Sequence, residues 1–132
     1  MNRRLLILGI GALLAATSAY AHHSFARMYH EEKSISLEGE VVSYEYRSPH
    51  TWVYFTANDA TGVARKWGAE WSNPRRLEPQ GVVASTLKAG DHVIVTGAPN
   101  RSATDYSVHL KSIRRPSDGW SWPTGGGGGR TR

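Results

Sequence analysis

The sequence contains no cysteine among its 132 residues. This absence excludes disulfides, thiolate metal sites and cysteine nucleophiles. A chain without cysteine has no thiol to misoxidise in an oxidising compartment, but there it must be stable through packing alone. Apolar residues make up 39% of the sequence, which suits one domain with a modest core.

Acidic residues are in the minority, with 11 Asp and Glu against 16 Lys and Arg. We interpret the net charge of +5 as ordinary solubilising charge. A nucleic-acid surface would need Lys and Arg gathered on one face, and the sequence gives no sign of such a cluster. We therefore expect no nucleic-acid partner.

Long hydrophobic runs are absent except at the start of the chain. Residues 1–21 combine Arg3 and Arg4, an apolar run of 12 residues at 5–16, and the A-x-A sequence that ends at Ala21. These are the three parts of a secretory signal peptide. The run is shorter than the ~20 residues that cross a bilayer, so we expect no membrane span after cleavage. An uncleaved anchor and export by the twin-arginine route remain alternatives.

Short runs of β-branched and aromatic residues dominate the rest of the sequence, and this composition predicts an all-β domain. Pro74 follows the potential N-caps Ser72 and Asn73, which predicts a short helix that Pro79 and Gly81 end. The predicted strands lie at residues 35–48, 50–57, 63–71, 92–98 and 105–115.

This order of elements is that of a five-stranded OB-like Greek-key barrel with one short helix between strands 3 and 4. We predict such a barrel over residues 22–119, with an open β-sandwich of the same strands as the alternative. Gly39 inside the first strand predicts a bulge or a sharp bend. The glycine run at 125–129 predicts a flexible tail over residues 120–132.

Cleavage after Ala21 would make His22 the first residue of a periplasmic or secreted protein. Its freed amine, with a pKa near ~8, and its own Nδ1 can chelate a metal ion in a six-membered ring. A second imidazole then completes a nitrogen set that suits Cu(II). His50 is the better candidate for this imidazole and His23 the other; Glu70 or Glu31 could add a carboxylate.

The other histidines fit structural roles. His109 alternates with Val108 and Leu110, so we expect its side chain to point to solvent. His92 begins a strand and His30 lies in a charged loop.

Aromatic residues gather on the second and third predicted strands, which form the usual ligand face of an OB-fold. We predict Trp52, Trp67 and Glu70 as ligand-binding residues, with packing in the core as the alternative for the aromatics. The partner on this face would be an unidentified protein or small ligand.

Catalytic motifs are absent: the sequence has no H-E-x-x-H, no nucleophile elbow and no paired-carboxylate motif. We therefore expect a binding protein rather than an enzyme. Three functions stay open. The first is metal binding, with copper favoured, the second is a non-catalytic ligand- or protein-binding module, and the third is a copper oxidase or monooxygenase.

Several segments resemble a family of small exported bacterial proteins that is known only as a domain of unknown function. They are HHSFA after the leader, GEVVSYEYRSPHTWVYF, KWGAEW, NPRRLEPQGV and LKAGDHVIVTG. The resemblance spans residues 22–119, with Ser48 in place of the family's usual Asn before Pro-His. It implies a periplasmic β-rich domain without an established activity. The matching positions are His22, His23, Pro49, His50, Trp52, Trp67, Glu70, Gly90 and Asp91.

We expect expression with export to yield a mature chain that begins at His22, because the leader has the three parts that signal peptidase recognises. Intact-mass spectrometry of the exported protein, with N-terminal sequencing, measures this. A mass that retains residues 1–21 would contradict the prediction and would leave His22 without a free amine.

Overall fold

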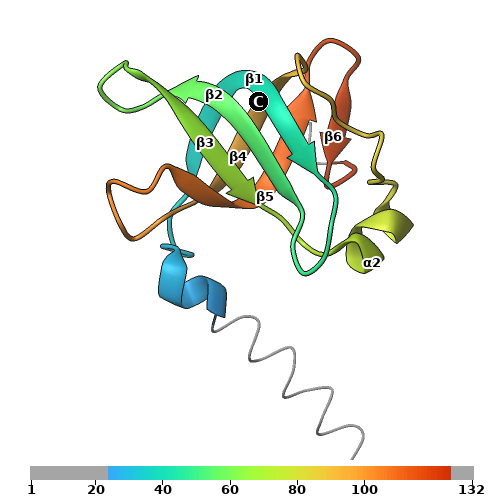
Figure 1. Cartoon of the computed structure of the whole chain (residues 1–132), viewed down its shortest axis with the longest axis horizontal. Helices are drawn as coiled ribbons and strands as arrows, with labels where there is room; N and C mark the ends of the chain where they lie inside the picture. Colours follow the sequence, from blue (N-terminus) through green and yellow to red (C-terminus); the bar gives the residue numbers. More distant parts are fainter. Residues whose placement is uncertain (1–23, 126–132) are drawn as a thin grey trace, which may run out of the picture.

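A computed structural model describes residues 24–125 of the chain. The strands curl into a barrel, with the short helix beside one end and a blue helical turn, residues 24–28, below it (Figure 1). In chain order the elements are β1 (Ile35–Glu45), β2 (Trp52–Asn58), β3 (Ala64–Glu70), α2 (Pro74–Leu77), the 3₁₀ helix η1 (Glu78–Gln80), β4 (His92–Pro99), β5 (Ser107–Arg115) and β6 (Trp120–Trp122).

The sheet closes on itself. Its strand order is β3-β2-β1-β4-β5-β6, and an additional parallel pairing joins β3 to β5. This pairing runs from Gly68 opposite Ser107 to Glu70 opposite His109. The predicted all-β class and five-stranded barrel are confirmed, as is the short helix between β3 and β4. Because β3 and β5 pair, the structure is a closed barrel rather than an open sandwich.

Strand β1 bends so that it can pair on both sides. Gly39 lies opposite Ala57 of β2 and also opposite Val93 of β4. A Cβ on Gly39 would lie 1.8 Å from the carbonyl oxygen of Thr56, so only glycine fits this close approach. The irregularity in pairing lies a little further on, between Val41 and Ser43, rather than at Gly39 itself.

The helix begins where the sequence predicts. The side chain of Asn73 accepts a hydrogen bond from the backbone N–H of Arg76, and Pro74 occupies the first turn. Gly81 ends η1 with a φ of 79°, in the left-handed region that favours glycine. Leu77, from the last turn of α2, is fully buried against the barrel core.

Alternation along the strands separates core from surface. In β2, Val53 and Phe55 point inward and are fully buried, and burial of each side chain contributes roughly 1.5–3 kcal/mol. Their neighbours Trp52 and Tyr54 point outward and are half-buried. The outer face of β2 therefore carries aromatic side chains that the core does not use.

A sixth strand, which the sequence analysis does not predict, extends the sheet. β6 pairs with β5 through Ile113 opposite Trp122. Trp122 packs edge-on against the buried Trp71, with 4.9 Å between ring centroids. The predicted leader and residues 126–132 of the predicted tail lie outside the described residues. Among residues 24–125, no helix is long and apolar enough to cross a membrane.

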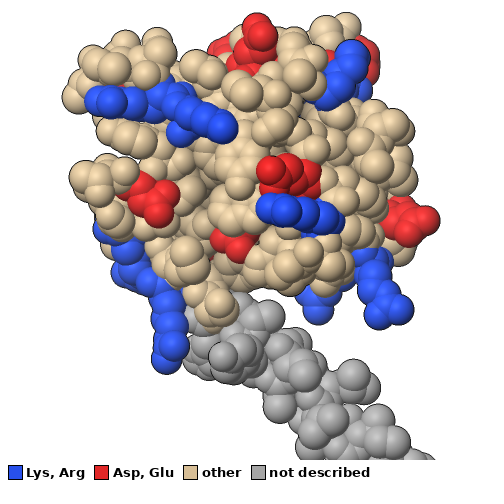
Figure 2. Space-filling view, viewed as in Figure 1, with Lys and Arg blue, Asp and Glu red and all other residues tan. Residues whose placement is uncertain are grey.

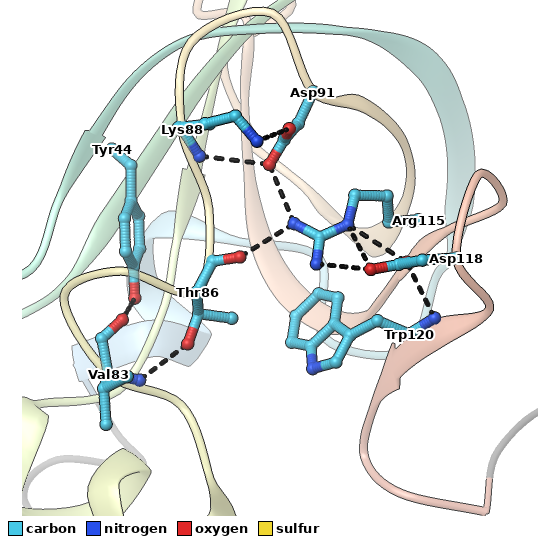
Figure 3. A network of polar contacts seen from close by, with 8 residues as sticks. All are labelled: Tyr44, Val83, Thr86, Lys88, Asp91, Arg115, Asp118 and Trp120. Atoms are coloured by element: carbon cyan, nitrogen blue, oxygen red, sulfur yellow. Dashed lines mark hydrogen bonds and ion pairs between the residues drawn. The ribbon is translucent and has the colours of Figure 1, made fainter.

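A polar network around Arg115 fastens the loop before β4 to the β5–β6 turn (Figure 3). Its guanidinium donates to the carboxylate of Asp91 at 2.8 Å, to the carbonyl of Thr86 at 2.8 Å and to Asp118 at 2.8 Å. The same group lies 5.5 Å from the centroid of the Trp120 ring. Asp91 is only 8% exposed, so its charge depends on these donors.

The network also sets two carboxyl pKa values. Desolvation acts to raise the pKa of Asp91, but hydrogen bonds from the backbone of Lys88 and from Arg115 outweigh it and lower that pKa. The hydrogen bonds from Arg115 lower the pKa of Asp118. A depressed carboxyl pKa contributes stability that is present above the unfolded pKa and is lost as the pH falls through the folded pKa.

We expect Arg115→Met to lower the free energy of unfolding by about 2–3 kcal/mol at pH 7, because the buried carboxylate of Asp91 then keeps only the exposed ammonium of Lys88 as a cation. Chemical denaturation measures the loss. The difference from wild type should shrink as the pH falls below ~4, where both carboxyl groups become protonated in the unfolded chain. Arg114→Met, at an exposed neighbouring position, is the matched control. Equal losses in the two variants, or a loss independent of pH, would contradict the expectation.

Candidate functional site

The site lies on the outer face of the barrel, across the pairing that closes it. Glu70 on β3 lies opposite Trp52 on β2 and opposite His109 on β5. Side chains at paired positions project to the same face of a sheet. Ala69 and Val108, one residue away on their strands, are buried in the core, so Glu70 and His109 belong to the outside.

The chain before β1 covers this outer face. Residues 24–28 are helical, and the N–H of Tyr29 bonds to the carbonyl of Phe25. Tyr29 then forms an isolated bridge with Asn100, just after β4. In this segment Tyr29 is 0% exposed, and beneath the segment Glu70 is only 7% exposed. Glu70 is therefore a carboxylate on an outer face that a separate segment has desolvated.

Two donors compensate for the burial of Glu70. The hydroxyl of Tyr29 donates to Oε2 at 2.5 Å, and Nδ1 of His50 lies 2.5 Å from Oε1. Burial, together with the hydrogen bond to Glu70, raises the pKa of Tyr29. Tyr29 therefore stays protonated and acts as a fixed donor, as a buried carboxylate requires.

His50 is held at its backbone as well as its ring. The next residue, Thr51, is fully buried, and its N–H donates to the carbonyl of Ser72 while its carbonyl accepts from Trp71. An ionised Glu70 only accepts, so the proton of neutral His50 sits on Nδ1 and the lone pair on Nε2. Within residues 24–125, no hydrogen bond involves Nε2 of His50. The side chain is 36% exposed, which leaves this nitrogen open to a ligand.

Phe25 connects both histidines to the N-terminal segment. Its ring stacks on His109 with a centroid distance of 3.8 Å and an angle of 6°, and lies 5.3 Å from the ring of His50. Nδ1 of His109 bonds to Glu31 at 2.8 Å. The expectation that the side chain of His109 lies in solvent is wrong. The residue faces outward as alternation predicts, but Phe25 and Glu31 cover it and its side chain is 24% exposed.

The predicted site residues separate into groups. His50 and Glu70 come together, whereas His22 and His23 lie outside the described residues. Trp67 packs in the core, where its Nε1 donates to the carbonyl of Ala57, and it also lines a groove on the outer face. Within residues 24–125, no three His, Asp or Glu side chains are placed to hold a metal ion together.

Trp52 lies near Glu70 but in a different setting. Its half-buried ring is parallel to that of Tyr54, with 5.7 Å between centroids. Both rings line an open groove of about 670 Å³ on the outer face.

Three residues of the site are not among the predicted ones: Phe25, Tyr29 and His109. The signal for the first two is present in the sequence. Phe25 and Tyr29 are four residues apart, and one helical turn places them on the same side. His109 has no such signal, because its role depends on the pairing of β5 with β3.

A search of curated proteins finds no match to the chain. One family model matches residues 11–108, and its family is described as one of unknown function (DUF6152). The matched region includes the HHSFA segment, the Pro-His pair and strands β1 to β4.

We expect Tyr29→Phe to lower the free energy of unfolding by about 1–2 kcal/mol, because Glu70 loses one of its two donors and stays buried. Thermal or urea denaturation measures the change. Tyr54→Phe is the matched control, since within the described chain no hydrogen bond involves its hydroxyl. A loss in Tyr29→Phe no larger than in the control would show that the hydroxyl does not support the carboxylate.

Proposed function

The chain belongs to this family of unknown function, and we propose that it is an exported, periplasmic metal-binding protein. In the proposal, the mature chain begins at His22. Its terminal amine and Nδ1 bind the ion together with Nε2 of His50. Cu(II) is the favoured ion, because amine and imidazole nitrogens in a planar set suit its tetragonal geometry.

The observation that carries the proposal is the pairing of His50 with Glu70. Histidines that bind metals almost always donate their other ring N–H to a carboxylate or carbonyl, which fixes the tautomer and the orientation of the ring. His50 has this arrangement through Nδ1, at 2.5 Å from Glu70. Both carboxylate oxygens of Glu70 already accept hydrogen bonds, from Tyr29 and from His50. We therefore assign Glu70 the role of a positioning residue rather than a ligand.

The position of Phe25 supports the participation of the mature N-terminus. Its ring lies 5.3 Å from that of His50. Phe25 is three positions after His22, and three residues span at most about 11 Å. The amine of a cleaved chain is therefore tethered within reach of His50. His23 is the alternative second imidazole, although adjacent residues chelate one ion awkwardly.

We propose binding rather than catalysis. The proposed site provides nitrogen ligands for a metal ion and a carboxylate that orients the imidazole of His50. No described residue is assigned to hold a substrate beside the ion. A binding protein needs only the first of these, and the sequence carries no catalytic motif. The proposed export rests on the sequence of the leader alone.

Calorimetric titration of the cleaved protein with Cu(II) tests the proposal, with electron paramagnetic resonance to report nitrogen ligation. We expect one equivalent to bind, and His50→Ala to abolish the high-affinity phase. Glu70→Gln should weaken affinity about 10- to 100-fold, because it removes the partner that orients the imidazole. A cleaved chain whose N-terminal amine is acetylated should bind as poorly as His22→Ala, since its amine has become an amide.

His92→Ala is the matched control, because His92 also pairs with a glutamate, Glu38, but is exposed and away from the N-terminus. Its affinity should equal that of wild type. Equal affinity in wild type and in the His22→Ala, His50→Ala double variant would refute the proposal.

A further inference from the structure

A second feature of the outer face is the groove beside Trp52. It has a volume of about 670 Å³, within the range of small-molecule sites. It lies on β2 and β3 and is bounded on the other side by the loop between β4 and β5. Its lining includes Trp52, Tyr54, Lys66, Ser102, Thr104 and Asp105.

Gly68 forms the floor of the groove. It lies opposite Tyr54 in the β2–β3 pairing. A Cβ at this position would come within 3.2 Å of both the Trp52 and Tyr54 rings, so even alanine would crowd them. The absence of a side chain lets two parallel aromatic rings, 5.7 Å apart, lie low over the strand. One wall of the groove is therefore aromatic.

The opposite wall is polar. Ser102, Thr104 and Asp105 are exposed residues of the β4–β5 loop that line it. The hydroxyls of Ser102 and Thr104 lie 3.2 Å apart, and the side chain of Asn100 accepts the N–H of Ser102. Short hydroxyl and carboxylate side chains on an anchored loop can both donate and accept hydrogen bonds.

The charges of the groove favour a neutral ligand. One cation, Lys66, and one anion, Asp105, line it. The ammonium of Lys66 lies 5.2 Å from the Tyr54 ring centroid and is partly engaged there. A groove that tracks a nucleic-acid backbone would carry an excess of positive charge. On the face drawn in Figure 2, Lys and Arg residues also lie apart, with Asp and Glu among them.

We infer that this groove binds a neutral oligosaccharide. A sugar ring has an apolar C–H face and a rim of hydroxyls. The aromatic wall is complementary to the first and the polar wall to the second. The aromatic wall of Trp52 and Tyr54 takes the C–H face, and the loop at 102–105 takes the hydroxyls. None of these six side chains is assigned to the ion, although Tyr29, which donates to Glu70, also lines the groove.

Titration of the cleaved protein with cellotriose and with triacetylchitotriose, in the presence of EDTA, tests the inference by ¹H–¹⁵N NMR. We expect saturable shifts at Gly68 and in residues 102–106 with at least one of the two sugars. Trp52→Ala should weaken binding at least about tenfold, in line with the loss of a stacking partner. Trp120→Ala, which removes a half-buried tryptophan outside the groove, should not.

A second variant keeps the inference testable if Trp52→Ala does not fold. Ser102→Ala with Thr104→Val changes only exposed loop residues and should also weaken binding. Two results would overturn the inference. One is the absence of shifts with either sugar when the sugar is in several-fold excess over the protein, and the other is equal affinity in all variants. Stronger binding of a single-stranded oligonucleotide that weakens with salt would overturn it too. Because EDTA is present, each of these results is independent of copper binding.

Discussion

The parallel pairing of β3 with β5 is the constraint on which the rest of the structure depends. It joins only Gly68–Glu70 to Ser107–His109, yet it turns an open sheet into a barrel. Closure removes two exposed sheet edges at once. It also sets Glu70 beside His109 on the outside, which creates the surface that residues 24–29 cover. Without the pairing of β3 with β5 the molecule would keep its strands but would lose the candidate site.

The outer face shows how one segment can change the chemistry of another. A carboxylate on the surface of a barrel is normally solvated and of little consequence. Here the cover of Tyr29 and Phe25 desolvates Glu70 and forces it to take fixed donors. One of those donors is a histidine that remains one-third exposed. The result is a rigid imidazole at the surface, produced by burial of its partner rather than of itself.

The strands and helix could be predicted because alternation, caps and turn residues are local signals. Val53 and Phe55 alternate with outward aromatics, and Asn73 precedes proline as a helix start requires. The short strand β6 could not be predicted, since three residues carry no period and it depends on pairing with β5. Chelation chemistry selects His50 as a candidate ligand, and the structure pairs it with Glu70. The burial of His109 could not be predicted, because it depends on contacts across the β3–β5 pairing.

The docking of residues 24–29 has a consequence for the stability of the fold. Its contact surface comes from two strands that lie far apart in the sequence, at Glu70 and His109. This contact surface exists only where the barrel brings the two strands together. The imidazole of His50 is therefore oriented only in the finished barrel. Any ligand that needs this orientation distinguishes the native chain from the unfolded one, and its binding stabilises the fold by an amount that grows with the ratio of free ligand to Kd.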